Sequence, residues 1–452
     1  MISDTIAAIA TGTTGTNAIS IVRVSGSESV EIVNNIFQSK DLTVQKSHTI
    51  HYGRIKCPET DVIIDEVLVM LMRSPRSFTT EDVVEINCHG GAFVTKRILE
   101  LLLSHGARHA HAGEFSKRAF LNGRIDLSKA EAIMDIIAAK SNHALELAMD
   151  SLDGKVTKLI NGLRSDILSI IAHIEVNIDY PEYDEVETIT TEILLPKSIA
   201  IYEKMDNLLQ TAKTGQLIKN GINTAIIGRP NVGKSSLLNQ LMREDKAIVT
   251  EIAGTTRDTI EGFVNIGGLT LNLVDTAGIR KTDDIIESIG VEKSKKIIEK
   301  AELILLVLDS SEPMSAQDQE LIKLTQNKNR IIILNKSDLK QRINTGDIKN
   351  YVSTSMTKES GITQLENEIK SLFEINNIQP NETFISNTRH IAKLNLSMQA
   401  IKIAIDQMKN NMPVDLIEID LKKSWSLLGE ISGIDTSAEL IDELFTKFCL
   451  GK

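Results

Sequence analysis

Hydrophobic and polar positions change their spacing along the chain, and the first change separates a mixed segment from a helical one. Residues 1–118 contain short β-like apolar runs at 67–71 and 83–86 together with a helical stretch at 92–104, which predicts an α+β domain. Residues 119–216 follow an almost purely helical pattern, which predicts the first part of a helical domain. One broad apolar face in this part predicts a helix packed against the core, with members Ala130, Ile133, Met134, Ile136 and Ile137.

A second change brings in an α/β segment and then a return to helices. In residues 217–376, strand-like runs alternate with helical ones, as in a doubly wound α/β domain. Helical periodicity then resumes, so residues 377–452 are predicted as the second part of the helical domain. The fold class is therefore multidomain: an α+β domain, and a helical bundle interrupted by an inserted α/β domain. Because both ends of the insert are tethered to the bundle, motion in one could pass to the other.

Composition limits the class of protein. A length of 452 residues predicts about three domains. No apolar stretch approaches the ~20 residues of a membrane span, and the N-terminus lacks the pattern of a secretory signal. The three cysteines, Cys57, Cys88 and Cys449, lie too far apart for a disulfide framework or a zinc site, which favours the cytoplasm. A net charge of −11 is unusual for a general nucleic-acid binder, so RNA would need a local basic patch or a partner.

One segment in the middle of the chain predicts a nucleotide site. Residues 228–236 read GRPNVGKSS and fit the G-x-x-x-x-G-K-[ST] phosphate loop. The apolar run 224–227 before them predicts a strand, and the residues from Ser236 predict a helix. The glycines let backbone N–H groups close round phosphates, Lys234 brings a positive charge to the β- and γ-phosphate oxygens, and Ser235 offers a hydroxyl to Mg²⁺.

Four further segments follow in the order that a GTPase requires. DTAG at 275–278 ends a strand; its Asp can hold Mg²⁺ through water, and its Gly lets a backbone N–H approach the γ-phosphate. NKSD at 335–338 carries a carboxylate suited to guanine N1 and N2, a donor pair that adenine lacks. STS at 353–355 lies where the S-A-K base loop of GTPases belongs and matches it in part. In GTTRD at 254–258, Thr256 could complete the Mg²⁺ shell as the first switch segment.

The position after DTAG departs from Ras-like proteins, because Ile279 stands where they have the Gln that orients the attacking water. With GTTRD and Asn231, this resembles the GTPases activated by potassium and by dimerisation of their G domains. In that group K⁺ takes the place of an arginine finger, which supplies on the order of 10³–10⁵ in rate. The resemblance implies as K⁺ ligands the Asn231 side chain, the carbonyls of Thr250 and Ile252, and Thr255. Alternatively, Asn231 is an ordinary turn residue.

Sequence blocks near both ends of the chain make the family resemblance more specific. The terminus FCLGK at 448–452 is close to F-C-I-G-K, and N-terminal blocks include IVRVSG at 21–26, EDVVE at 81–85 and HGG at 89–91. A further block, GEFSKRAFLNGRIDL, occupies 113–127. Together these resemble the MnmE/TrmE family of tRNA modification GTPases over the whole chain.

The resemblance implies a set of GTP-site residues. These are Asn231, Val232, Gly233, Lys234, Ser235, Ser236, Thr250, Glu251, Ile252, Ala253, Gly254, Thr255, Thr256, Asp275, Thr276, Ala277, Gly278, Asn335, Lys336, Asp338 and Ser353. Mg²⁺ would be held by Ser235 and Thr256. Glu287 aligns with the Glu that the family uses, through a bridging water, to position the attacking water, and Asp283 and Asp284 are close rivals for this catalytic role.

The N-terminal domain of this family resembles the folate-binding part of glycine-cleavage T-protein and binds 5-formyl-tetrahydrofolate as one-carbon donor. The corresponding positions are Arg23, Glu81, Arg124 and Lys452; the family commonly has Lys in place of Arg124. Arg23 and Lys452 could meet folate carboxylates, and Glu81 could accept from the amine face of the pterin. Cys449 is either a reactive thiol near this donor, at a possible modification site, or a packing residue beside aromatics. His89 has no evident acid–base partner in the sequence and is taken as structural.

The resemblance predicts a cytoplasmic homodimer, a potassium-stimulated GTPase. With the FAD- and NADH-dependent partner MnmG, in a heterotetramer-like complex, it would form the 5-carboxymethylaminomethyl or aminomethyl group on wobble uridine U34 of tRNA. A ribosome-assembly GTPase of the Era or EngA type is the alternative, although this chain has neither a second phosphate loop nor a basic GXXG segment. A GTPase with a degenerate folate site, acting as a scaffold, is a further alternative.

Overall fold

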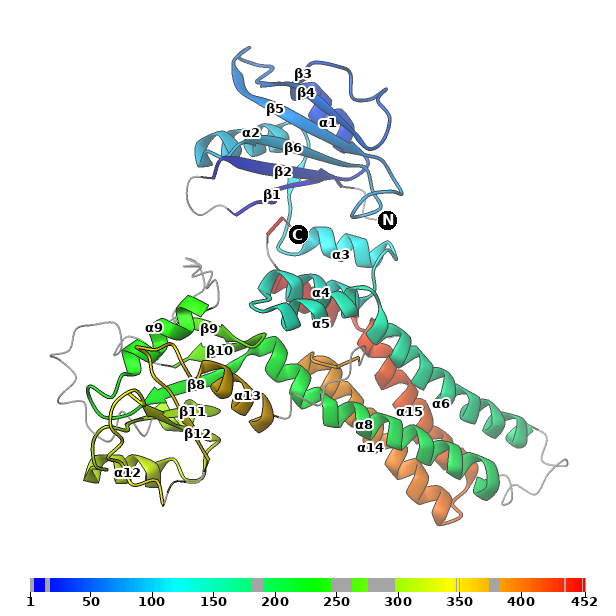
Figure 1. Cartoon of the computed structure of the whole chain (residues 1–452). Helices are drawn as coiled ribbons and strands as arrows, with labels where there is room; N and C mark the ends of the chain where they lie inside the picture. Colours follow the sequence, from blue (N-terminus) through cyan, green and yellow to red (C-terminus); the bar gives the residue numbers. More distant parts are fainter. Residues whose placement is uncertain are drawn as a thin grey trace. The chain divides into compact units, whose positions relative to one another are not determined.

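The computed structural model describes residues 4–12, 17–179, 190–244, 262–274, 297–346, 348, 350–373, 383–434, 436–448 and 450–451. The chain forms two compact units, Met1–Met134 with Gly429–Lys452, and Asp135–Leu428. The mixed α/β and helical character predicted from the sequence is confirmed (Figure 1). No described helix is both long and apolar enough to cross a membrane.

The first unit is built on a seven-stranded sheet with the strand order β3-β4-β5-β6-β2-β1-β7. Neighbouring strands are antiparallel except for the parallel pair β1 and β7. Its elements are β1 (Ile6–Ile9), β2 (Ile19–Ser25), α1 (Ser29–Ile36), β3 (Phe37–Gln38), β4 (Thr49–Lys56), β5 (Ile63–Met72), β6 (Val83–His89), α2 (Ala92–Ser104), β7 (Arg108–His109), α3 (Glu114–Leu121), the start of α4 (Leu127–Ala138) and α16 (Ala438–Thr446).

One face of this sheet is covered by helices, and the other is covered in part, where Ile6 and Ala8 of β1 pack with Phe115 of α3. Buried residues alternate with exposed ones along β4, as expected for a strand with one face in a core. The covered face packs against the apolar sides of α1 and α2, with Val69, Ile86 and Leu102 fully buried between them (Figure 1). The helix predicted at 92–104 is α2, with the same bounds.

The C-terminal helix belongs to this first unit. Phe445 lies between Phe120 and Phe448, with ring centroids 6.1 and 4.9 Å apart, and the three pack with Leu127 and Ala130 at the start of α4. Phe120 lies more than three hundred positions before Phe445 and Phe448 in the sequence. Their hydrophobic contact therefore packs the C-terminal helix against the N-terminal part of the chain.

The second unit contains a six-stranded sheet with the order β13-β12-β11-β8-β10-β9, parallel except for the β9–β10 hairpin. Helices cover both faces, so that central strand β11 is buried at all seven positions. The elements of this part are β8 (Ile222–Ile227), α9 (Lys234–Glu244), β9 (Phe263–Ile266), β10 (Leu269–Leu273), β11 (Leu303–Asp309), α12 (Ala316–Leu324), β12 (Arg330–Asn335), β13 (Tyr351–Ser353) and α13 (Ile362–Leu372).

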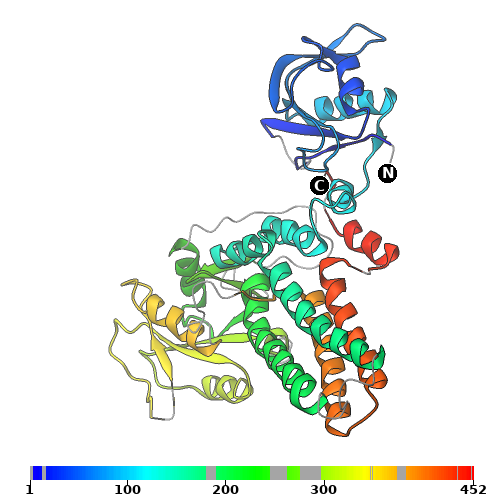
Figure 2. The ribbon, with the colours of Figure 1, turned by 90° about the vertical axis from the view of Figure 1, so that its right-hand side faces the viewer.

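The remaining helices of the second unit run side by side (Figure 2). They are α5 (Asn142–Leu152), α6 (Lys155–Asp179), the π-helical η1 (Thr190–Leu194), α8 (Leu195–Asn220), α14 (Thr388–Lys409) and α15 (Val414–Ser432). The Ser397 hydroxyl donates to the Ser424 carbonyl at 3.1 Å, and the Arg164 guanidinium lies 4.1 Å from the Trp425 ring. Helices that precede the six-stranded sheet in the sequence therefore pack with helices that follow it.

The apolar stripe predicted on α4 faces the core only in part. Ala130 is fully buried and Met134 packs against the aromatic cluster, but Ile137 is 44% exposed. The prediction of a continuous core face is therefore wrong for Ile137, because α4 buries its first turns and leaves its last turn in contact with solvent.

Candidate functional site

The phosphate loop follows β8 at the point where the order of the second sheet reverses. β8 lies between β10 and β11, which follow it in the chain on opposite sides, and ligands bind at such switch points. Gly233 has φ +98°, and a Cβ there would collide with the Asn335 carboxamide, so only glycine fits. Asn231 also has a left-handed φ of +62° and is exposed. The loop therefore has the backbone conformation and the close approach that its glycines predict.

Lys234 is the first residue of α9 and lies against the loop. Its Nζ donates to the carbonyl oxygens of Gly228 at 2.9 Å and Arg229 at 2.7 Å. Burial lowers the pKa of Lys234, a cost that an anion beside it would offset. Ser235 and Ser236 follow in the first turn, both exposed, where free N–H groups and the helix dipole favour phosphate. The residues at this helix start fit a nucleotide triphosphate and its magnesium.

The predicted base-binding element is tied to the phosphate loop. Asn335 ends β12 and donates from Nδ2 to the Val232 carbonyl at 2.8 Å. Lys336, with φ +61°, donates from Nζ to Asp309 Oδ2 at 2.6 Å. Burial alone would raise the pKa of Asp309, but hydrogen bonds from Lys336 and Ser311 outweigh it and lower that pKa. The two loops therefore form one polar surface at the carboxyl ends of β8, β11 and β12.

Ser355 contacts the carboxylate that is expected to read guanine. Its hydroxyl donates to Asp338 Oδ1 at 2.6 Å, and this hydrogen bond lowers the pKa of Asp338. Ser353, named from the sequence, lies in β13 with an exposed side chain, paired with Leu334. Sequence reasoning missed Ser355, because a partial match to S-A-K gives no register for the loop.

Several predicted residues lie outside the described part of the chain. They are Thr250, Glu251, Ile252, Ala253, Gly254, Thr255, Thr256, Asp275, Thr276, Ala277, Gly278, Asp283, Asp284, Glu287, Cys449 and Lys452. Their roles at the magnesium, potassium, catalytic and folate sites stay predictions.

A second group of predicted residues meets in the first unit. The Arg23 guanidinium lies 5.6 Å from the Phe78 ring centroid, and that of Arg124 lies 5.0 Å from the same ring. Arg124 also donates to the Phe78 carbonyl at 2.7 Å, and Arg23 donates to Glu85 at 2.7 Å. We call Arg23, Phe78, Glu81, Arg124 and Gly451 the N-terminal site. Phe78 has no sequence signal of its own and was missed.

The end of the chain reaches this site. Arg23 Nη1 donates to the Gly451 carbonyl at 3.1 Å, across 428 positions of sequence. Gly451 has φ +87°, and a Cβ there would lie 2.7 Å from the Ala10 Cα, so glycine is required for this close approach. The residue that precedes Lys452 is therefore fixed beside Arg23.

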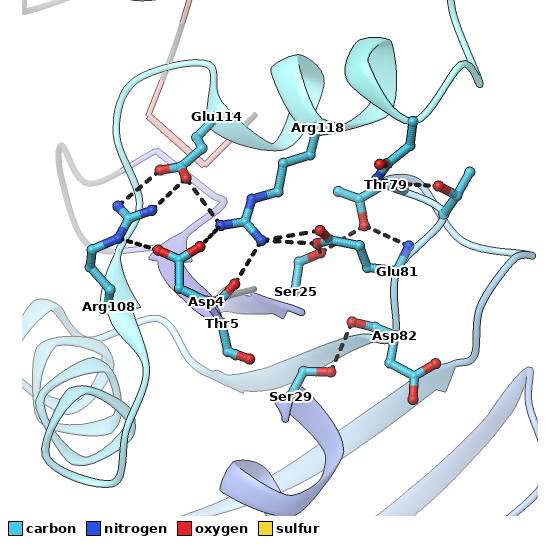
Figure 3. Close-up of polar contacts among 12 residues, drawn as sticks. Asp4, Thr5, Ser25, Ser29, Thr79, Glu81, Asp82, Arg108, Glu114 and Arg118 are labelled. Atoms are coloured by element: carbon cyan, nitrogen blue, oxygen red, sulfur yellow. Dashed lines mark hydrogen bonds and ion pairs between the residues drawn. The ribbon is translucent and has the colours of Figure 1, made fainter. Parts of the chain in front are cut away.

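Glu81 joins the N-terminal site to a group of paired charged side chains. Its Oε2 accepts from the Ser25 hydroxyl at 2.7 Å, and its two oxygens accept from Arg118 Nη1 at 3.1 and 3.2 Å. We call the connected charged residues the ion-pair cluster (Figure 3): Asp4, Glu81, Arg108, Glu114 and Arg118. Glu114 and Arg118 stand four positions apart in the 113–127 block, a signal for an ion pair that the sequence analysis did not use.

His89 has an acid–base partner that the sequence did not reveal. Its Nδ1 lies 2.7 Å from Asp65 Oδ1, and this hydrogen bond raises the pKa of His89. The backbone N–H of His89 donates to the other oxygen of Asp65 at 2.8 Å. These two contacts to Asp65 fix the end of β6. Cys57 and Cys88 are buried, and burial raises the pKa of the Cys88 thiol, which disfavours a reactive thiolate at Cys88.

Two family models match the chain in succession. Residues 5–124 match the model described as GTP-binding protein TrmE N-terminus, and residues 127–449 match the MnmE helical domain. Together they span both units.

Curated relatives match along their full length. The tRNA modification GTPase MnmE of Lactiplantibacillus plantarum is 52% identical and covers 99% of this chain and 98% of its own. That of Bacillus cytotoxicus is 51% identical and covers 99% of both. Among solved structures, the G domain of the T. maritima FeoB iron transporter is 26% identical over 33% of this chain and 98% of that chain, with a TM-score of 0.25. The assignment to a family therefore rests on the full-length relatives and the two family models.

Proposed function

The chain belongs to the MnmE (TrmE) family of tRNA modification GTPases, and on that premise we propose a potassium-stimulated GTPase that is activated by dimerisation and modifies the wobble uridine with MnmG. That it is a GTP hydrolase acting in tRNA modification follows from the full-length match, the observation that carries the assignment. A TrmE N-terminus joined to an MnmE helical domain favours this function over a ribosome-assembly switch of the Era or EngA type.

The GTP half of the proposal is supported by the nucleotide-site contacts. Asp338, held by Ser355, would accept hydrogen bonds from guanine N1 and N2. Lys234 would exchange its two carbonyl partners for β- and γ-phosphate oxygens. Magnesium would be held by Ser235 and Thr256, and it would neutralise charge that develops on the phosphates.

Potassium activation is proposed for the neighbouring loop. The Asn231 side chain is exposed at the mouth of the phosphate loop, where it could act as an oxygen ligand with Thr250, Ile252 and Thr255. A cation there would supply the charge that an arginine finger supplies elsewhere. The left-handed φ of Asn231 also fits the alternative that Asn231 is an ordinary turn residue. The comparison of GTP turnover in K⁺ and Na⁺ described below decides between these two roles.

Glu287 is the proposed positioner of the attacking water. A carboxylate can orient water or accept its proton, which the apolar Ile279 cannot do. We expect Glu287→Ala to lower kcat by orders of magnitude with little change in GTP affinity, and Asp284→Ala to be the matched control. Loss in Asp284→Ala alone, measured as single-turnover hydrolysis, would move the role to Asp284.

The one-carbon half of the proposal is supported by the N-terminal site. Arg23 and Arg124, from distant parts of the sequence, both lie on Phe78, and Gly451 brings the end of the chain to Arg23. Cations beside an aromatic ring and a carboxylate at Glu81 fit 5-formyl-tetrahydrofolate, which has two carboxylates, an aromatic ring and a pterin. Lys452 would add a further cation, and Cys449 remains a proposed modification site.

We propose three domains: an N-terminal domain at 1–118, a helical domain whose two parts are 119–216 and 377–452, and a G domain at 217–376 inserted between those parts. The packing of α8 with α14 supports the insertion, since these helices flank the six-stranded sheet in sequence. Through them, nucleotide-driven motion would reach the bundle. A homodimer in the cytoplasm, in a heterotetramer-like complex with FAD- and NADH-dependent MnmG and tRNA, would form the 5-carboxymethylaminomethyl or aminomethyl group on U34.

GTP turnover in K⁺ against Na⁺ at equal ionic strength tests this proposal. Strong stimulation by K⁺, with K⁺-dependent pairing of G domains in GDP and aluminium fluoride, is expected. Equal rates in both salts would contradict the cation mechanism and leave a GTPase whose activator comes from another protein. Calorimetric titration with 5-formyl-tetrahydrofolate separates the main proposal from the scaffold alternative, which predicts no binding.

A further inference from the structure

Arg118 is the centre of the ion-pair cluster. Its side chain is completely buried on α3, yet its guanidinium faces carboxylates from two other places in the chain, Asp4 and Glu81, and Glu114 on α3 itself. Nη2 donates to Asp4 Oδ1 at 2.7 Å and to Glu114 Oε1 at 3.2 Å, and Nη1 donates to the Asp4 carbonyl at 2.8 Å and to both oxygens of Glu81 (Figure 3). Burying such a charge is costly unless it is paired, so the arrangement is specific.

The cluster contains three carboxylates and two guanidinium groups. Asp4 and Glu114 each contact both arginines, since Arg108 donates to Asp4 at 2.7 Å and to Glu114 at 2.6 Å. Burial by itself would raise the pKa values of Asp4 and Glu114, but the hydrogen bonds and charges of Arg108 and Arg118 outweigh it and lower both. Glu114 also accepts from the backbone N–H of His111, which fills its acceptor positions, whereas the Asp4 carboxylate accepts one hydrogen bond from each arginine.

Glu81 is the carboxylate that the cluster shares with the N-terminal site. Within the described part of the chain its side chain accepts only from Arg118 and the Ser25 hydroxyl, and the contacts to Arg118 are longer than the contact from Arg118 to the Asp4 carboxylate. Two carboxylate oxygens offer about four acceptor positions, and these contacts occupy both positions on Oε2 and one on Oε1, so Oε1 keeps capacity for a ligand donor. The Glu81 side chain is 17% exposed.

We propose that Arg118 is a positioning residue that holds Glu81 in place as the charged acceptor for an N–H donor of a pterin. This inference rests on the proposed folate function of the N-terminal site. A carboxylate accepts such a donor most strongly when it is deprotonated and correctly turned. Arg118 supplies the orientation by contacting both oxygens from one nitrogen, and it supplies the compensating charge.

Removal of Arg118 would take away the donor that contacts both oxygens of Glu81 and leave the Ser25 hydroxyl on Oε2. Glu81 would then lie near Asp4 and Glu114, with Arg108 as the remaining cation of the cluster. The orientation of the Glu81 carboxylate, and with it the affinity for a pterin donor, should therefore be lost.

The test is titration of the full-length protein with 5-formyl-tetrahydrofolate. Arg118→Lys keeps the charge but cannot serve Asp4 and both Glu81 oxygens at once, so we expect affinity to fall about tenfold. For Arg118→Met we expect a loss of about 10- to 100-fold. Arg108→Met is the matched control: it removes a cluster arginine that does not touch Glu81, and its affinity should stay within about threefold.

A double-mutant cycle gives the second measurement. If Arg118 acts through Glu81, Arg118→Lys should cost little further affinity in the Glu81→Gln background. Hydrogen exchange of β1 and β2, which lie in the first unit with the substituted residues, reports whether each variant is folded there. If Arg118→Met is unfolded, Arg118→Lys decides the test.

The outcomes separate the inference from the function on which it rests. Equal losses in Arg118→Lys and Arg108→Met, or independent losses in the cycle, would mean a purely structural cluster and overturn the inference. Unchanged affinity in Arg118→Lys would overturn it as well. Absence of binding to the wild-type chain would instead contradict the folate site itself, and the inference with it.

Discussion

The nucleotide site is assembled from loops at one edge of a single sheet, whereas the N-terminal site is assembled from side chains at both ends of the chain. In the first, Lys234 contacts backbone carbonyls five and six residues away, and the geometry comes from glycine and left-handed backbone. In the second, Arg23 contacts Gly451 across 428 positions. We therefore expect the nucleotide site to be disrupted by substitution of single loop residues. The N-terminal site should be disrupted by loss of the contacts that hold distant segments together.

The two sites also use charge differently. Lys234 is a buried cation whose neighbours are neutral carbonyl groups, so its pKa is lowered and it favours an incoming anion. The ion-pair cluster is already compensated, with Asp4 and Glu114 below their ordinary pKa values. The charge of Lys234 is therefore available to attract a ligand in the nucleotide site. The charges of the ion-pair cluster, beside the N-terminal site, are already paired with one another.

The largest effect is expected from a substitution that should lower GTP turnover and leave folate affinity unchanged. Lys234→Met removes the positive charge that lies against the phosphate loop at the start of α9, and we expect GTP turnover to fall by about 10²–10³-fold. Folate affinity, measured by calorimetry on the same preparation, should be unchanged. A folate affinity that fell in parallel would show that the sites do not act independently.

The next effect concerns closure of the N-terminal site. Gly451→Val places a side chain against β1 at a left-handed φ, which costs on the order of 1–3 kcal/mol and should move the carbonyl away from Arg23. We expect about tenfold weaker folate binding with normal GTP turnover. Leu450→Ala, at an exposed neighbouring position, is the control. If both variants bind equally well, the chain end does not shape this site.

A smaller effect is expected in the base loop. Ser355→Ala removes the hydroxyl that orients Asp338, so GTP affinity should fall about three- to tenfold, in line with about 0.5–1.5 kcal/mol for one hydrogen bond. Ser353→Ala should have little effect, because Ser353 is an exposed residue of β13 and the hydroxyl that contacts Asp338 is that of Ser355. Nucleotide titration of the two variants compares them directly, and the reverse order would restore Ser353 as the base-loop serine.

The smallest effect is an acid sensitivity of the first unit. Asp4 and Glu114 have lowered pKa values when folded, so their contribution to stability is present above their ordinary pKa of about 4 and is lost as pH falls through the lower folded values. Hydrogen exchange of β1 and β2 should therefore accelerate below about pH 4. In Asp4→Asn this acid dependence should be weaker, and unchanged dependence would assign it to other carboxylates.

Local patterns predicted much of the fold. The helix 92–104 has the predicted bounds, and the strand predicted at 224–227 lies within β8. The helix after the phosphate loop begins at Lys234, two residues earlier than predicted, because Lys234 and Ser235 already adopt helical backbone at its N-terminus. Apolar spacing gives the middle of an element more reliably than its ends, since the terminal residues are fixed by hydrogen bonds that periodicity does not record.

The sequence by itself determined the family, the GTP chemistry and the residues of the phosphate and base loops, because those functions depend on backbone conformations and side chains that lie within a few positions of each other. Only the tertiary structure decided that Phe78 lies between Arg23 and Arg124, that Ser355 contacts Asp338, and that Arg118 compensates Glu81. These contacts join segments brought together by burial of apolar surface, which sets no fixed spacing between the polar residues that it places side by side.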